Sequence, residues 1–361
     1  MEFQPYFHPD FEKLNLFHAP DARLLPVEKD FVAPENYHAT SIFPEYFKVN
    51  GQWILAEESR MDCVAVWTGE KVRITEFRHL KKGDLVFIGR TEDGSEGIYM
   101  HTRGFASPSS AGRDAFAFRQ GRSRETAFSR DYDQLYDLLR HEKDHGHIVW
   151  VLGPAVAFDS DSRDAFARLV KNGYVNAVLA GNALATHDLE GAYKRTALGQ
   201  DIYTQQSMPM GHYHHIDTIN RVRLHGSITA FIEKENIQDG IIHACVKNDV
   251  PFVLTGSIRD DGPLPEVYGD VYAGQDAMRE QVRKATTVIC MATALHSIAT
   301  GNMTPSFRVM PDGSIRPVFF YCVDISEFAV NKLGDRGSLS ARSIVTNVQD
   351  FVVNVAKGLG V

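Results

Sequence analysis

Two neighbouring carboxylates and an arginine stand together in a loop that glycine and proline residues confine. The segment Gly256–Pro265 contains Arg259, Asp260 and Asp261 in succession. Adjacent carboxylates can hold a cationic amine and exchange a proton with it, and an arginine can pair with the carboxylate of a ligand. Because a plain surface turn rarely needs so rigid a setting, the composition of this loop favours a functional site.

A histidine that could carry a proton lies in the segment 292–303, which also contains Thr293 and Asn302. Imidazole titrates near neutral pH, so His296 is the candidate proton carrier. A lone histidine is equally compatible with a structural role in the core. Its position directly after an apolar run supports the catalytic interpretation.

Two further apolar runs end in residues suited to binding a ligand. Gly181, Asn182 and Ala183 follow one run, with Asp188 a few residues later, and small residues let a ligand approach the backbone. An ordinary turn between a strand and a helix is the alternative. Asp324 ends the other run and could accept hydrogen bonds from ribose hydroxyls, a role compatible with helix capping.

The usual signatures of nucleotide and metal sites are missing from the sequence. No G-x-G-x-x-G follows the run 147–153, which continues instead into Gly153-Pro154-Ala155, so bound NAD would need a non-standard arrangement. The histidine cluster His212–His215 has no HExxH motif or carboxylate spacing beside it. We therefore expect no metal, and a polar loop that lines the site.

These candidate residues depend on a β-α-β pattern for their positions. The runs 147–153 and 175–181 predict buried strands, and the spacing of apolar residues over 161–173 predicts the helix between them. Helices are also expected over 132–146 and 273–286, and further strand candidates are 240–248, 251–257, 287–295 and 317–326. The most economical assembly is an α/β fold with a doubly wound, mostly parallel sheet, which brings the carboxyl ends of its strands to one edge.

The chain is expected to divide into three parts. Residues 1–36 predict an extended N-terminal arm, and residues 37–130 predict a small β domain plus a linker, with 101–130 a possible lid. Residues 131–361 form the α/β catalytic domain. Turn motifs such as Asn50-Gly51 separate the short alternating runs of the β domain.

Composition limits the classes of partner. The net charge is −8 and basic residues are scattered, which argues against nucleic-acid binding. The four cysteines have no CxxC spacing, no apolar stretch is long enough to span a membrane, and no leader segment is evident. We expect a cytoplasmic protein without membrane association.

Several blocks, in the same order along the chain, resemble the archaeal-type ornithine cyclodeaminases. They are AGNALATHD (180–188), CVKNDVPFVLTGSIRDDGPLPEV (245–267), ATALHSIATGNM (292–303) and VDIS with DRGS (323–338). That family, once labelled lysine-oxoglutarate reductase/saccharopine dehydrogenase homologues, also forms the C-terminal half of cyanobacterial arginine dihydrolase fusions. The resemblance covers about Tyr37 to the C-terminus.

The resemblance implies a fold related to that of deoxyhypusine synthase, with NAD as cofactor and a homo-oligomeric assembly, a dimer or tetramer. The residues expected to contact NAD are Asn182, Ala183, Asp261, Thr293, Ala294, Leu295, His296, Asp324 and Asp335. Those expected in catalysis are Asp261, His296 and Asp260, and those expected to bind substrate are Asp188, Arg259 and Asn302.

The implied activity is conversion of L-ornithine to L-proline and ammonia by transient hydride transfer, in ornithine metabolism and proline biosynthesis. The loop His212–His215 differs from the basic or amide residue usual in the family, so a different substrate is an alternative. An NAD-dependent dehydrogenase or cyclodeaminase acting on lysine, another diamine acid or an opine-like compound is the second reading. A catalytically silent NAD-binding sensor is the third.

Overall fold

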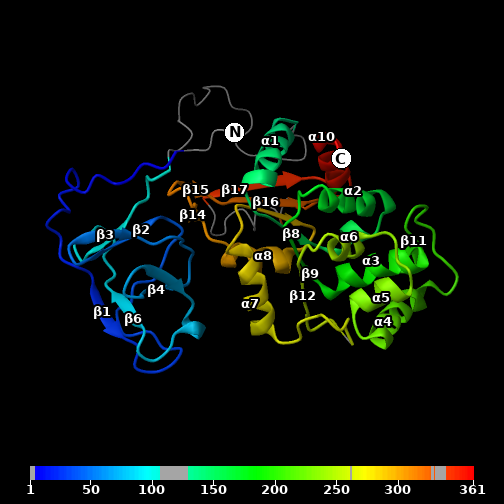
Figure 1. The fold of residues 1–361 in the computed structure, drawn as a ribbon, viewed down its shortest axis with the longest axis horizontal. Coiled ribbons are helices and arrows are strands. Elements are labelled where there is room, and N and C mark those ends of the chain that lie inside the picture. The colour runs from blue at the N-terminus through cyan, green and yellow to red at the C-terminus, as the bar shows by residue number, and fades with distance from the viewer. Residues whose placement is uncertain (1–4, 106–128, 261, 327–328, 330–338) are drawn as a thin grey trace.

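A computed structural model describes residues 5–105, 129–260, 262–326, 329 and 339–361 (Figure 1). An antiparallel β region comes first in the chain, and a larger α/β region follows it. The segment 101–130, for which the sequence left a lid as one interpretation, lies mostly outside the described residues.

Two antiparallel sheets make up the N-terminal region. The first has the order β1-β6-β4-β5 and the second the order β3-β2-β7. Their bounds are β1 Arg23–Pro26, β2 Glu45–Val49, β3 Gln52–Leu55, β4 Val64–Trp67, β5 Val72–Thr75, β6 Leu85–Ile88 and β7 Ile98–Met100. Asn50 and Gly51 both have positive φ and close the β2–β3 hairpin, as their sequence predicts. The predicted small β domain is thus confirmed as an antiparallel β region, and β1 shows that part of the expected arm pairs with β6.

The α/β region is built on six parallel strands. They are β8 Ile148–Leu152, β9 Ala177–Gly181, β12 Phe252–Thr255, β13 Thr287–Met291, β16 Phe319–Asp324 and β17 Ser340–Val345. Their order in the sheet is β12-β9-β8-β13-β16-β17. Numbered by their order along the chain, the strands follow one another across the sheet as 3-2-1-4-5-6, which is the order of dinucleotide-binding folds. The chain adds strands in one direction from β8 to β12 and in the other from β13 to β17, so the winding reverses between β8 and β13. The prediction of a doubly wound parallel sheet is confirmed.

Helices cover both faces of this sheet (Figure 1). Trp150 and Phe166 belong to the core on one face, and Cys290 and Met278 to the core on the other. The first face is covered by α1 Ser129–His145, α2 Ser160–Lys171, α3 Asn182–Lys194, α6 Ile241–Lys247 and α10 Val348–Leu359. The second face is covered by α7 Val271–Val282 and α8 Ala294–Met303.

The remaining elements lie in the connections between those already named. They are η1 Phe77–His79, η2 Pro154–Ala157, β10 Thr196–Ala197, β11 Gln200–Asp201, η3 Gly211–Tyr213, α4 His214–His225, α5 Ile228–Lys234, β14 Phe307–Val309 and β15 Ile315–Pro317.

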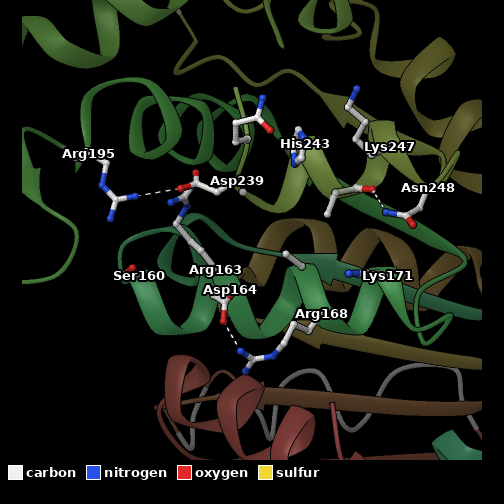
Figure 2. Close-up of a pocket in the computed structure, with 14 residues that line it drawn as sticks. Ser160, Arg163, Asp164, Arg168, Lys171, Arg195, Asp239, His243, Lys247 and Asn248 are labelled. Atoms are coloured by element: carbon white, nitrogen blue, oxygen red, sulfur yellow. Dashed lines mark hydrogen bonds and ion pairs between the residues drawn. The ribbon is translucent and has the colours of Figure 1, made fainter. Parts of the chain in front are cut away.

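One strand prediction is wrong, because the run 240–248 forms helix α6 beside α2 (Figure 2). The carboxylate of Asp188 accepts hydrogen bonds from the amides of Ile241 and Ile242, at 3.0 and 2.8 Å, and so satisfies the first turn of the helix. The buried residues recur at helical spacing, while His243 and Lys247 face outward. A short apolar run does not separate a strand from a buried helix by periodicity alone.

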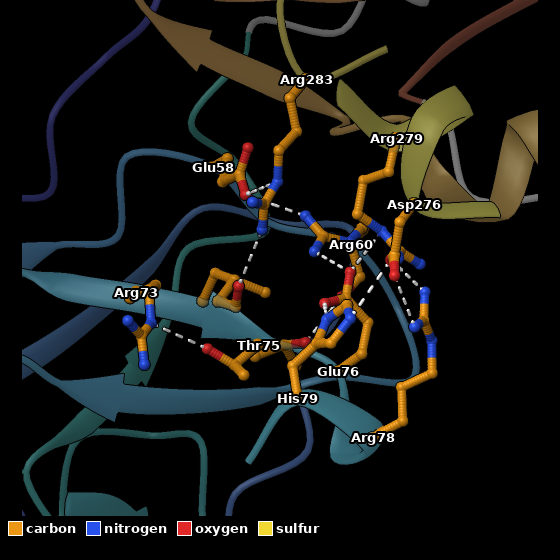
Figure 3. Close-up of polar contacts among 12 residues, drawn as sticks. Glu58, Arg60, Arg73, Thr75, Glu76, Arg78, His79, Asp276, Arg279 and Arg283 are labelled. Carbon is orange, nitrogen blue, oxygen red and sulfur yellow. Dashed lines mark hydrogen bonds and ion pairs between the residues drawn. The ribbon is translucent and has the colours of Figure 1, made fainter. Parts of the chain in front are cut away.

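Arginines and carboxylates join the β region to α7 (Figure 3). Glu76 pairs with Arg60 and with Arg279, whose Nε lies 2.6 Å from Glu76 Oε1. Arg78 Nη1 donates to Asp276 Oδ2 at 2.9 Å. Burial raises the pKa of Glu76, but the two arginines outweigh it and lower the pKa to about 2. Glu76 is therefore ionised at neutral pH and holds α7 against the β region.

Candidate active site

The backbone is unusually close-packed at the point where the winding of the sheet reverses. The amide of Gly153, directly after β8, donates to the carbonyl of Met291 at 2.8 Å. A Cβ at Gly153 would lie 1.9 Å from the carbonyl oxygen of Ala292, so only glycine fits. Ala292 itself has a φ of 50°, a left-handed conformation that is rare outside glycine and often marks functional sites.

His296 reaches from the first turn of α8 to the ends of β9 and β12. Its Nε2 lies 2.7 Å from Thr255 Oγ1, and its Nδ1 lies 3.3 Å from Thr293 Oγ1. A Cβ at Gly181 would lie 3.1 Å from the His296 ring, so that glycine makes room for the imidazole. Burial lowers the pKa of His296, although Asp260 and Thr255 act in the opposite direction. The ring is therefore neutral at physiological pH and able to accept a proton.

Asn182 connects the end of β9 to the loop after β12. It is 8% exposed, its Nδ2 donates to Asp260 Oδ1 at 3.4 Å, and its Oδ1 accepts the amide of Leu264 at 3.0 Å. Asp260 Oδ2 accepts the amide of Ser257 at 2.7 Å. These bonds fix the Asp260 carboxylate beside Asn182, while Arg259 in the same loop is exposed.

Two helices begin at this edge without a capping side chain. The N-cap residue of α3 is Gly181, which has no side chain, and that of α8 is Thr293, whose hydroxyl accepts no hydrogen bond from a helix amide. By contrast, Asp159, Asp270 and Asn347 cap α2, α7 and α10 with their side chains. Uncapped N-terminal amides leave donors and positive dipole ends for an anion.

The remaining residues expected to contact NAD lie around the same edge where they are described. Ala183 is in the first turn of α3, and Ala294 and Leu295 are exposed in the first turn of α8. Asp324 ends β16, and its Oδ1 accepts the amide of Ser326 at 2.9 Å. Asp261 and Asp335 fall outside the described residues.

The structure does not bring two of the expected substrate-binding residues to this group. Asp188 is fully buried on the far side of α3, where its Oδ1 accepts from Arg163 Nε at 2.9 Å. Asn302 is exposed in the last turn of α8, six residues beyond His296.

The histidine-rich loop is linked through Thr196 to the buried Glu190 carboxylate on α3. Glu190 Oε2 lies 2.9 Å from His187 Nδ1, and its Oε1 accepts from Thr196 Oγ1 at 2.8 Å. Thr196 Oγ1 in turn lies 2.9 Å from His214 Nδ1. Burial raises the pKa of Glu190, but hydrogen bonds from His187, Gly199 N–H and Thr196 lower it below its ordinary value. Glu190 therefore fixes the loop, and across the described residues no three His, Cys, Asp or Glu side chains form a group suited to a metal ion.

Thr255 was not among the residues expected from the sequence, yet its hydroxyl lies within hydrogen-bond distance of His296 Nε2. The available signal was a hydroxyl residue at the last position of the apolar run 251–255, at the same sheet edge as the other candidates. Its pairing with His296 depends on a contact between residues 41 positions apart.

Fold and site together define a Rossmann-type α/β protein with its polar residues gathered at the reversal point of a 3-2-1-4-5-6 sheet. No helix among the described residues is long and apolar enough to cross a bilayer. The family model described as "Arginine dihydrolase ArgZ-like, C-terminal, Rossmann fold" matches residues 134–355.

Known proteins resemble the chain over most of its length. An ornithine cyclodeaminase of Methanocaldococcus jannaschii is 37% identical over 341 residues, which cover 92% of this chain and 76% of that protein. The crystal structure of a conserved putative LOR/SDH protein from Methanococcus maripaludis has a TM-score of 0.84 at 36% identity, covering 94% of this chain and 98% of the other. The ternary complex of AgrE with ornithine and NAD⁺ has a TM-score of 0.59 at 34% identity, covering 95% and 46%.

The chain belongs to the family of the archaeal ornithine cyclodeaminases and the C-terminal region of ArgZ-like arginine dihydrolases. The resemblance identified from the sequence blocks is thereby confirmed. A relation to deoxyhypusine synthase stays a prediction.

Proposed function

We propose that this protein is an NAD-dependent ornithine cyclodeaminase, which converts L-ornithine to L-proline and ammonia. The observation that carries the proposal is the group of His296, Thr255, Asn182 and Asp260 at the reversal point of the sheet. Membership of the family supports it, as does the ornithine and NAD⁺ complex of AgrE.

The residues at this edge fit NAD. The uncapped first turns of α3 and α8 offer amide donors to a pyrophosphate, and Gly153 keeps side-chain atoms away from the backbone between them. The Asp324 carboxylate can accept hydrogen bonds from ribose hydroxyls. Bound NAD⁺ would supply the hydride acceptor for Cα of ornithine and afterwards return the hydride to the cyclised product.

The protein's own groups would handle charge and protons. A neutral His296 can take a proton from the α-ammonium of ornithine, which the amine must lose before Cα can give up hydride. The Asp260 carboxylate would hold a cationic amine of the substrate. Asn182 keeps Asp260 in place, and Thr255 orients the imidazole.

Ring closure needs little further help from the protein. The δ-amine attacks the imine carbon at Cα within the same molecule, and effective concentrations for such reactions reach about 10⁵ M or more. The α-nitrogen then leaves as ammonia. Ornithine thus gives proline and ammonia with no net oxidation.

The test is to incubate the purified protein with L-ornithine and NAD⁺ and to measure proline, ammonia and NADH absorbance. Equal amounts of proline and ammonia without net NADH are expected. Net NADH would replace the proposal with a dehydrogenase, and turnover of lysine or another diamine acid alone would replace the substrate. Absence of any product with NAD⁺ bound would indicate a sensor.

A pair of histidine variants locates the chemistry. His296→Gln should reduce turnover at least about a hundredfold, because general acid–base catalysis typically contributes that much. His145→Gln is the matched control, since His145 is exposed in the last turn of α1 at the opposite edge of the sheet. Equal activity of both variants would reject the role of His296.

A homo-oligomer remains part of the proposal. Exposed apolar side chains gather along the segment 198–216, where Tyr203 is 73% and Met210 63% exposed. Large apolar side chains exposed in one segment often mark a protein interface. Light scattering during size-exclusion chromatography measures the assembly, and a monomer at micromolar concentration would contradict it.

A further inference from the structure

A pocket of about 670 Å³ lies between α2 and α6, and no residue of the candidate active site lines it (Figure 2). Ala167 on α2 and Ala244 on α6 are among its lining residues, and their small side chains leave the space between the helices open. The rest of the lining is dominated by charged side chains.

Positive charge is concentrated in this pocket. Five lysines and arginines line it against two aspartates, and counting the buried Asp188 as a third acid still leaves an excess of two cations. The whole chain has a net charge of −8, so this excess runs against the charge of the protein. A local positive potential in a concave surface attracts small anions.

The acids of the pocket are already engaged by arginines. Asp239 pairs with Arg163 and Arg195, and Asp164 pairs with Arg168. Among the described residues, by contrast, neither Lys171 nor Lys247 has an ion-pair partner. The two lysine ammonium groups are therefore available to a ligand.

The wall of the pocket is rigid. Arg163 is 3% exposed, and its guanidinium donates to the carboxylate and the carbonyl of Asp188, each at 2.9 Å. A Cβ at Gly240 or Gly191 would lie 2.7 or 2.9 Å from the guanidinium, so both positions pack directly on it. A preformed wall loses little freedom when a ligand binds.

We propose that this pocket is a second binding site, which takes a small polyanion carrying phosphate groups or several carboxylates. Lys171 on α2 and Lys247 on α6 would pair with its charges, and His243 would donate a hydrogen bond. Burial, and then Lys247, lower the pKa of His243, although Asp239 and Asp188 act in the opposite direction, so the neutral imidazole can donate from one ring nitrogen. The site does not depend on the substrate of the candidate active site.

Calorimetric titration of the full chain with pyrophosphate, and separately with citrate, tests the proposal. Both titrations are done at constant ionic strength and with saturating NAD⁺, which keeps the candidate active site occupied. We expect saturable binding of one probe per chain. Tighter pyrophosphate would identify a phosphate ligand, and tighter citrate a polycarboxylate.

Matched double variants assign the binding to the pocket. Lys171→Gln with Lys247→Gln should weaken binding by about tenfold or more, because two direct charge contacts are lost. The matched control is Lys234→Gln with Lys357→Gln, because these lysines are also exposed in the last turns of helices. Neither lysine lines the pocket, so this double variant should leave the affinity for the probe unchanged. No saturable binding of either probe, or equal weakening in both double variants, would overturn the proposal.

Discussion

Gly153→Ala is a direct test of the close packing between β8 and β13. The new Cβ would lie 1.9 Å from the carbonyl oxygen of Ala292, whereas real Cβ contacts stay above 3.0 Å, so the two backbones must separate by about 1.1 Å. Both strands are buried and paired along their length, which leaves little room for that movement. Overpacking of this kind costs about 1–3 kcal/mol, or a fall in the unfolding midpoint of about 1–4 °C for a chain of this length.

The same separation of the two backbones should weaken the binding of NAD⁺. The backbone after β8 and β13 would no longer lie where the pyrophosphate is proposed to bind, so we expect NAD⁺ affinity to fall by about tenfold or more, a loss of at least about 1.4 kcal/mol. Thermal unfolding with and without NAD⁺ measures both effects. Gly269→Ala is the matched control, because a Cβ there meets nothing within 4 Å. Identical melting and identical NAD⁺ affinity for the two variants would refute the reasoning.

Arg163→Met leaves the Asp188 carboxylate without its cation and should destabilise the protein by about 3–5 kcal/mol in urea unfolding; a loss below 1 kcal/mol would contradict this. Arg60 and Arg279 lower the pKa of Glu76 to about 2. The ionised Glu76 carboxylate therefore adds roughly 3 kcal/mol to the free energy of unfolding, and this contribution is complete above about pH 4.5 and is lost as the pH falls towards 2. The difference in unfolding free energy between wild type and Glu76→Gln should therefore shrink in acid, and a constant difference would reject the ion pairs. Asp261→Asn should abolish turnover of ornithine without lowering the unfolding midpoint, and near-normal activity would remove Asp261 from the mechanism.

Five of the six strands of the large sheet were predictable because burial on both faces leaves a clear mark, whereas the edge strand β17 Ser340–Val345 is mostly half-buried and was not among the predicted strands. Ile148–Leu152 is buried at every position, so the sequence shows an unbroken apolar run between a helix and Gly153. The run 240–248 looked similar, yet its apolar residues serve a helix that begins on the carboxylate of Asp188. That contact spans more than fifty residues, and no local pattern contains it.

The sequence predicted that the candidate site lies at a set of strand ends. It did not predict which side chains point into the site. Asn182 and Asp188 are close in sequence, but six residues of helix turn a side chain by about 240° and move it about 9 Å along the axis. Asp188 therefore faces Arg163 while Asn182 faces Asp260. The pairing of Thr255 with His296 likewise depends on the sheet order, which places β12 and β13 on opposite sides of β9 and β8.

The ion pairs between α7 and the β region limit where the chain can be truncated or fused to another domain. The family match begins at residue 134, yet Arg279 and Asp276 on α7 pair with Glu76 and Arg78 far upstream. In a fragment that starts near residue 134, Asp276 and Arg279 would lose their ion-pair partners and would face water instead. We expect the two regions to be inherited and expressed as one unit, so that gene fusions join other modules before the β region and not between it and the Rossmann core.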